Sequence, residues 1–220
     1  AAAAAPPGDA PSVRLRACPA LLPDRPGEGQ TFLDSVVQAD KVLARGPTVE
    51  HFLREMIAWA GSDYPKSSKY YQNVLDAYYV VGLIDRISYS DKHALRSTLP
   101  KTTEIQVIRA HCIRSALARL EHGQRLLDEA VQLQPFTRRQ MAEALGMTAH
   151  DGSYHIRLFV SLGVLTQEGT ILNLSPLGTA YSNDKTASYA ARTLSHTVRE
   201  TKQAWFNEDG LEALAYLIDD

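Results

Sequence analysis

The stretch "QMAEALGMTAHDGSYHIRLFVSLGVL" (residues 140–165) decides the predicted fold. Apolar residues recur at helical spacing on both sides of Gly146, which predicts a short helix, a turn at this glycine and a longer second helix. Thr148 or Asp151 is the expected N-cap of the second helix. The residues expected to face the core are Met141, Ala144, Leu145, Ile156, Phe159, Val160 and Leu162. The stretch therefore predicts a helical hairpin whose second helix has a polar face.

An earlier part of the chain repeats this pattern. "REMIAWAG" (residues 54–61) aligns with "RQMAEALG" (residues 139–146), and "VLDAYYVVGLI" (residues 74–84) aligns with "HIRLFVSLGVL" (residues 155–165). Each aligned pair shares a glycine, and the first copy holds the insertion "DYPK" between its two glycines. Two matching segments in the same order favour an internal repeat over two unrelated hairpins.

Each copy has the same kind of segment before it. A helix is predicted within "TFLDSVVQADKVLARG" (residues 31–46), and another over "EIQVIRAHCIRSALARLEHGQRLLDEAVQL" (residues 104–133). Thr48 and Thr137 then stand where the next helix begins, and threonine is a favoured N-cap residue. The repeat therefore includes the preceding helix and its connection.

A short polar hairpin is predicted after each copy. "VLTQEG" and "TILNLSP" alternate around Glu168 and Gly169, and "LIDRISYSDKHALRSTLP" (residues 83–100) has the same pattern less clearly. This order predicts a mainly α fold with small β-hairpins, built as two winged helix-turn-helix units in tandem. The expected segments are a flexible leader or extended arm at 1–30, a first winged-helix domain at 31–103, a second at 104–184 and a C-terminal helical extension at 185–220.

The polar face of each second helix is the candidate surface for DNA bases. A major groove about 12 Å wide accepts such a helix. The candidates for base contacts are His150, Ser153, Tyr154 and Arg157 in the second copy, and Lys69, Gln72, Asn73 and Asp76 at the equivalent positions of the first. Amides pair with adenine, guanidinium groups with guanine or phosphate, and a carboxylate with cytosine. Because every surface helix has a polar face, a merely solvated face is the alternative.

Basic residues beside these helices are the candidates for phosphate contacts, which fix register without reading sequence. They are Lys66, Lys92, Arg96, Lys101, Arg138 and Arg139. The second hairpin, "LTQEGTILNLS", has no Lys or Arg. The first copy is therefore expected to bind DNA more electrostatically than the second.

Composition argues against several other classes of protein. The apolar runs are far shorter than the roughly 20 residues of a membrane span. The two cysteines form no metal or disulfide pattern, so a cytoplasmic protein is expected. We expect no catalytic residue, metal ligand or cofactor in this chain, because "DYPK" and "SDKH" lack the strand context of a nuclease site and the histidines lack zinc spacing. The net charge of −2 argues against non-specific coating of DNA but leaves specific binding open.

Residues 137–184 resemble the winged-helix modules in the DNA-recognition portions of some type II restriction endonucleases, which are bacterial enzymes. The resemblance rests on the Thr-x-x-Gln-Met-Ala pattern that begins at Thr137, the tyrosine in the second helix, the "LGVL" ending and the "LSPLG" after the hairpin. It implies recognition of double-stranded DNA, with a magnesium-dependent nuclease domain or subunit outside this chain. Whether the full protein is an enzyme stays open.

Two alternatives share the predicted fold. A replication initiator or a transcriptional regulator would bind duplex DNA with the same units. A protein-interaction scaffold of a chromosome-segregation complex would use them to bind protein helices, and the near-neutral charge and the ten tyrosines fit this alternative. The target sequence and the oligomeric state are not determined by the sequence.

Overall fold

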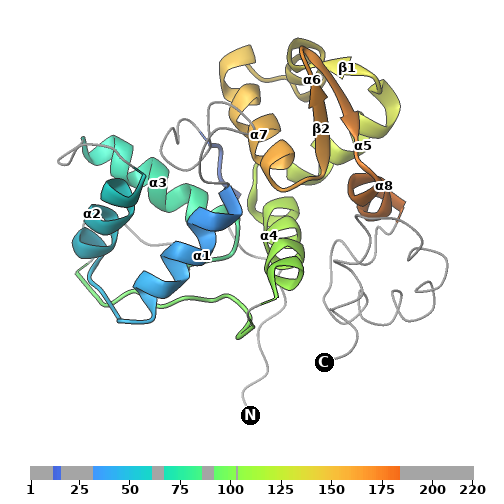
Figure 1. Ribbon diagram of the computed structural model, residues 1–220. Helices are drawn as coiled ribbons and strands as arrows, with labels where there is room; N and C mark the ends of the chain where they lie inside the picture. The colour runs from blue at the N-terminus through green and yellow to red at the C-terminus, as the bar shows by residue number, and fades with distance from the viewer. Residues whose placement is uncertain (1–11, 16–31, 61–66, 86–91, 103, 184–220) are drawn as a thin grey trace.

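The computed structural model describes residues 12–15, 32–60, 67–85, 92–102 and 104–183. In these residues the chain is mainly helical with a small antiparallel sheet, as the sequence predicts (Figure 1). The helices are α1 (Phe32–Leu43), α2 (Val49–Trp59), α3 (Ser68–Val80), α4 (Ile105–Arg119), α5 (Gly123–Leu133), α6 (Arg138–Leu145), α7 (Ala149–Ser161) and α8 (Pro176–Asn183). The strands are β1 (Phe136–Thr137), β2 (Leu165–Glu168) and β3 (Ile171–Leu174).

The second half of the chain places the sheet beside the α6–α7 pair. β2 and β3 form the hairpin predicted around Glu168 and Gly169, with Leu165 opposite Leu174. β1 pairs with the other edge of β3, so β3 is the central strand. α6 and α7 cross closely, because a Cβ atom at Gly152 would lie only 2.9 Å from the Cβ atom of Ala142.

The predicted helix boundaries at α6 and α7 are confirmed. The Thr137 side chain accepts a hydrogen bond from the backbone N–H of Gln140, and the Gln140 side chain accepts one from the backbone N–H of Thr137, which together form a capping box. Gly146 ends α6 in the left-handed region, at φ 69°. Of the two predicted caps for α7, it is Thr148 that accepts a hydrogen bond from the N–H of Asp151.

Two predictions about the core of this pair are wrong. Ala144 and Val160 are only partly buried, whereas Ala142 and Leu158 are buried. Ala142 faces Gly152 at the crossing point, where the two helices approach most closely, and it is therefore buried in place of Ala144. The other five predicted core residues are buried as expected.

The single helix predicted over residues 104–133 is two helices in the structure. α4 ends at Arg119, the backbone of its C-cap residue Leu120 is extended, and His122 has the left-handed φ of 59° before α5 begins at Gly123. Gly123 packs against α4, because a Cβ atom there would lie 2.6 Å from the carbonyl oxygen of Ala116. Because the helix is interrupted here, the backbone at Leu120 can pair outside the helix, and it forms a parallel bridge with Val13. A long-range contact therefore occupies the position where helical periodicity predicts continuity.

The hairpin predicted in the first half is only partly within the described residues, because 86–91 lie outside them. Residues 83–85 and 92–102, which the structure describes, form one isolated antiparallel bridge, between Thr48 and Ala94, and no strand. Leu95 adds a backbone hydrogen bond to Pro47, at 2.8 Å. Thr48 caps α2 as predicted. The C-terminal extension predicted at 185–220 also lies outside the described residues.

The two aligned copies make matching hydrogen bonds at their second glycines. Gly82 and Gly163 both have positive φ, 72° and 80°. Each donates its N–H to a carbonyl three residues earlier, and the carbonyl of each accepts a hydroxyl, from Thr98 at 2.6 Å and from Ser175 at 2.5 Å. The bridge at Thr48 likewise corresponds to the pairing of Thr137 with Ile171. The internal repeat therefore has a counterpart in backbone geometry.

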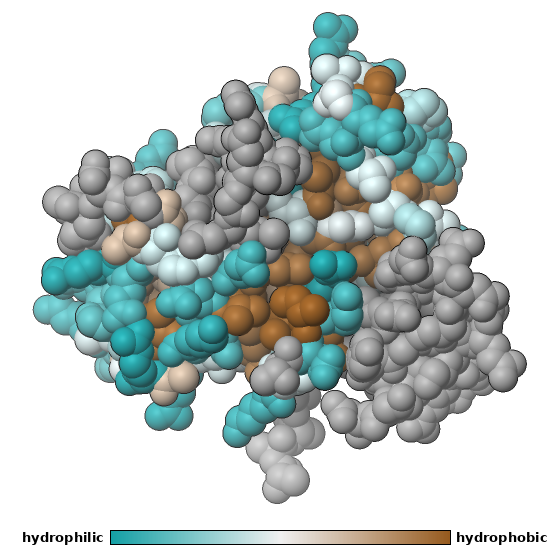
Figure 2. Space-filling view, viewed as in Figure 1, coloured by the Kyte–Doolittle hydropathy of each residue, from teal (hydrophilic) through white to brown (hydrophobic). Residues whose placement is uncertain are grey.

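The two halves are joined where α4 packs against the end of α3. The Arg119 guanidinium donates to the Tyr79 carbonyl at 2.9 Å and lies 4.7 Å from the centre of the Tyr79 ring. His111 Nε2 donates to the Gly82 carbonyl at 2.8 Å. Buried residues of both halves belong to one apolar cluster. Figure 2 shows hydrophilic residues over the outer side of α2 and hydrophobic ones near α4.

Among the described residues, the structure contains no helix with the length and apolar character needed to cross a membrane.

Candidate nucleic-acid interface

The first turns of α7 hold an ordered polar pair. The rings of His150 and Tyr154 meet edge to face, with centroids 5.0 Å apart, and the Tyr154 hydroxyl lies 3.4 Å from His150 Nε2. Ser153 donates its hydroxyl to the His150 carbonyl at 2.7 Å, so its remaining capacity is that of an acceptor. His150 is exposed, and Ser153 and Tyr154 are half-buried. Helices that enter the major groove contact bases mainly with such N-terminal residues.

Two arginines lie close together beside this helix. Burial, and then the neighbouring charge of Arg157 on α7, lower the pKa of Arg138 below the ordinary value for arginine. Arg138 is the first residue of α6, and its guanidinium donates to the Gln167 side chain on β2 at 2.7 Å. The structure thus brings positive charge together from α6 and α7, and the hairpin supplies a neutral partner, Gln167, rather than a basic residue. Paired guanidinium groups suit a phosphate.

The acidic residues near α7 are engaged by other arginines. Asp151 in the first turn of α7 lies 3.8 Å from the guanidinium of Arg14. Glu143 on α6 pairs with the predicted phosphate contact Arg139, at 2.9 Å, and both side chains are well exposed. Arg139 is therefore available to an anion only in competition with Glu143.

The equivalent residues of α3 are arranged differently. Gln72 donates its amide to the Asp76 carboxylate at 3.1 Å, so two of the predicted base contacts bind each other. Both are half-buried, as is Asn73, whereas Lys69 in the first turn is exposed. The amide of Gln72 would have to leave Asp76 before it could pair with adenine. Binding of bases by α3 would thus break a hydrogen bond of 3.1 Å, whereas the contact between Tyr154 and His150 on α7 is longer, at 3.4 Å.

The predicted phosphate contacts of the first copy are dispersed. Lys66 lies outside the described residues, and Lys92 is exposed. Arg96 and Lys101 line a pocket of about 530 Å³ together with Arg45 and Asp40 from the end of α1. None of the predicted base contacts on α3 lines this pocket. The structure therefore groups Arg96 and Lys101 with the end of α1 rather than with the polar face of α3.

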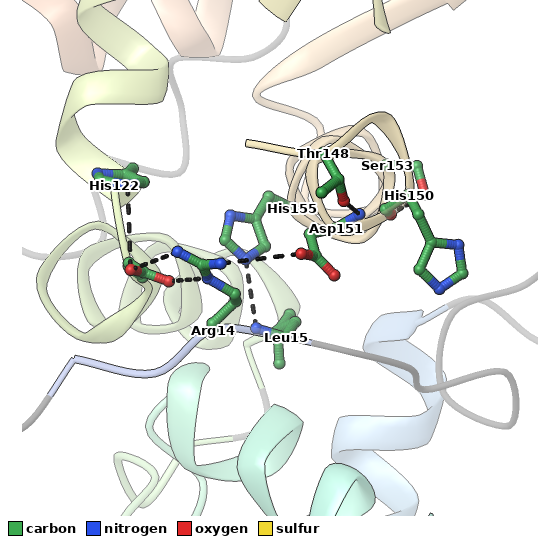
Figure 3. Close-up of polar contacts among 9 residues, drawn as sticks. Arg14, Leu15, His122, Thr148, His150, Asp151, Ser153 and His155 are labelled. Carbon is green, nitrogen blue, oxygen red and sulfur yellow. Dashed lines mark hydrogen bonds and ion pairs between the residues drawn. The ribbon is translucent and has the colours of Figure 1, made fainter. Parts of the chain in front are cut away.

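A polar cluster around the buried His155, which the sequence analysis did not predict, lies on another side of α7. Figure 3 shows His155 facing the N-terminal segment and His150 pointing away from it. The Arg14 guanidinium forms a two-pronged ion pair with Glu121, with one N–O distance of 2.9 Å, and this pair holds the pKa of Glu121 below its ordinary value. The backbone N–H of Leu15 donates to His155 Nε2 at 3.2 Å.

His155 is neutral in this environment. Burial, the largest effect, lowers its pKa to about 4, and the positive charges of His122 and Arg14 add to this against the attraction of Glu121 and Asp151. Because Nε2 accepts the hydrogen bond from Leu15, the ring proton is on Nδ1. Nδ1 is buried and has no hydrogen-bond partner in the described part of the chain.

A local signal for this contact is present in the sequence. In "SVRLR" (residues 12–16) apolar and polar residues alternate, which is the pattern of an extended segment with one buried face. Val13 and Leu15 are indeed buried, and Arg14 between them is half-exposed. Most of the leader predicted at 1–30 lies outside the described residues, and within 12–15 Val13 forms a parallel bridge with Leu120.

Comparison of the chain with known protein families, with curated proteins and with solved structures yields no match.

Proposed function

We propose that the chain binds a specific double-stranded DNA site through two winged helix-turn-helix units, with α7 as the principal reading helix. The observation that carries the proposal is the repeated geometry of the two copies. Each has a capped second helix, a positive-φ glycine after it and a hydroxyl bonded to the carbonyl of that glycine. A helix held in this way against a preceding helix presents one face outward, and in the second copy the β2–β3 hairpin lies beside it.

The chemistry of α7 supports its role as the reader. His150 and Tyr154 can each donate to and accept from base edges, and their mutual contact reduces the side-chain freedom lost on binding. Arg138 and Arg157 supply positive charge, and two acids of these helices, Asp151 and Glu143, are paired with Arg14 and Arg139. On this proposal, base contacts come from the start of α7, and phosphate contacts come from the arginines that flank it.

The proposal includes a biological setting that rests on the resemblance of residues 137–184. The chain acts in the bacterial cytoplasm as the recognition module of a type II restriction endonuclease. A magnesium-dependent nuclease domain or subunit outside this chain then cuts the DNA. A replication initiator or a transcriptional regulator would use the same contacts without cleavage.

Selection from a pool of randomised duplexes tests the proposal. The wild type should enrich one sequence, and binding to the selected duplex should weaken steeply with salt. Tyr154→Phe should weaken binding to that duplex by about 1–3 kcal/mol and relax the preference at one base pair. Gln132→Ala, an exposed change on α5, is the matched control and should leave both unchanged.

Three outcomes would contradict the proposal. The first is a selection that enriches no duplex. The second is an equal effect of Tyr154→Phe on selected and unrelated duplexes, which would remove the base-reading role of α7. The third is co-purification with a helical protein partner in the absence of any selected duplex, which would favour the interaction scaffold instead.

A further inference from the structure

A short segment near the N-terminus is fixed to the connection between α4 and α5. The Val13 N–H donates to the Arg119 carbonyl at 2.8 Å, and the Val13 carbonyl accepts from the Glu121 N–H at 2.8 Å. Val13 and Leu15 are 4% and 2% exposed and belong to the main apolar cluster. Residues 12–15, which we call the strap, are therefore part of the fold although a long stretch of sequence separates them from these partners.

The strap contacts α7 at two points. Arg14, which is held by Glu121, reaches Asp151 in the first turn of α7 at 3.8 Å. Leu15 donates its backbone N–H to His155 Nε2, one turn further along α7, inside the core. Glu121 belongs to the α4–α5 connection, so the strap ties α7 to a different element of the second half. Two contacts on successive turns restrict both the rotation of α7 about its axis and its translation.

The strap and the candidate base contacts lie on different sides of α7. His155 faces the strap, and His150 points away from it (Figure 3). A polar group must be held within about 0.5 Å of its productive position to make specific contacts. A change in the strap would therefore move His150 and Tyr154 without removing any group that contacts DNA.

We propose that the strap positions α7 for DNA, so that docking of the strap and binding of a duplex strengthen each other. The inference rests on the proposed function. Because the coupling is reciprocal, the factor by which the docked strap tightens DNA binding is also the factor by which DNA stabilises the docked strap.

Leu15→Pro in the full chain tests this coupling, because proline removes the N–H that donates to His155. Ser12→Pro is the control, since Ser12 is exposed and forms no hydrogen bond or ion pair with the described residues. Arg14→Gln is a milder variant that leaves the Val13 and Leu15 contacts in place. Affinity for the selected duplex and amide hydrogen exchange of α7 and α3 are measured for all three and for the wild type, under conditions where each is folded.

If the strap positions α7, Leu15→Pro should weaken binding to the selected duplex by about 5- to 150-fold, the usual range of allosteric coupling. Arg14→Gln should weaken it less, and Ser12→Pro should not change it. Exchange should accelerate in α7 and not in α3, and the duplex should slow exchange of the Leu15 amide in the wild type. These last two effects distinguish positioning of α7 from a general loss of stability.

Equal affinities of Leu15→Pro and Ser12→Pro for the selected duplex would contradict the positioning role of the strap and would leave the proposed function unaffected. If Leu15→Pro does not fold, an Arg14→Gln variant with wild-type affinity and wild-type exchange in α7 overturns the strap. If the wild type selects no duplex, the proposed function fails and the coupling to DNA fails with it. Amide hydrogen exchange of α7, compared between Leu15→Pro and the wild type, then still shows whether residues 12–15 hold this helix in place.

Discussion

Acidification should destabilise the protein through His155. The neutral ring accepts the Leu15 N–H in the core, and burial lowers its pKa from 6.5 to about 4. A histidine that resists protonation in the folded state stabilises that state fully above the unfolded pKa, near 6.5. This stability is lost progressively as the pH falls through that value toward 4. The gap between the two values corresponds to roughly 3 kcal/mol.

The matched variant is His155→Gln, because the glutamine carbonyl can accept the Leu15 N–H but does not titrate. Urea denaturation followed by circular dichroism gives the free energy of unfolding of both proteins at about pH 7 and about pH 4. The wild type should lose roughly 3 kcal/mol more than the variant over this interval. The pKa of Glu121 is also lowered, mainly by its hydrogen bond and ion pair with Arg14, which both proteins retain, and the charge of His155 is the smallest of the effects on it.

Parallel losses in the two proteins would refute this reasoning, because they would show that His155 binds a proton equally well in the folded and unfolded states. A smaller loss in the wild type would also refute it, since the sign would then require a raised pKa.

Three further changes test the fold and the interface. Gly152→Ala should destabilise the protein by about 1–3 kcal/mol in urea denaturation, because its Cβ would lie 2.9 Å from that of Ala142; wild-type stability would mean that α6 and α7 can separate without cost. Thr137→Ala removes the capping box of α6 and should cost about 0.5–2 kcal/mol in the same assay, and no loss would contradict the capping role. Arg138→Gln should weaken binding to all duplexes alike and reduce the salt dependence of binding measured by titration. Lys101 lines the separate pocket at α1, so Lys101→Gln should change neither quantity. A loss of affinity in Arg138→Gln that depends on the DNA sequence would contradict a phosphate contact.

Much of the second half could be predicted from sequence because its signals are local. The capping box at Thr137, the glycine that ends α6 and the hairpin turn at Gly169 each depend on a few neighbouring residues. The repeat could be predicted because it preserves a glycine, Gly82 in one copy and Gly163 in the other, at a position where the backbone has positive φ. The residues that pack at the crossing of α6 and α7 required the structure, since Gly152 decides which alanine faces it.

The contacts made by the strap could not be predicted in this way. Arg14 and Glu121 are 107 residues apart, and Leu15 and His155 are 140 apart. No local pattern selects such partners, although the alternation in residues 12–16 indicates an extended segment. The break between α4 and α5 could not be predicted from local sequence either, because the helical periodicity of residues 104–133 continues past it.

The sequence names candidate residues for the interface, but it does not show how they are arranged. The Gln72–Asp76 hydrogen bond joins residues four apart on one helix, so sequence spacing could have predicted it. The approach of Arg157 to Arg138 depends on how α6 and α7 pack, and sequence spacing alone does not give it. With these two contacts known, the base and phosphate contacts are expected mainly from the second copy rather than from the first.

Chemical footprinting of the wild-type chain on a duplex selected from a randomised pool is the most direct test of DNA recognition by this protein. Recognition by α7 predicts one discrete protected stretch at the enriched sequence, which disappears when that sequence is scrambled. Protection spread evenly along the duplex, or no protection at concentrations where the chain is folded, would contradict it.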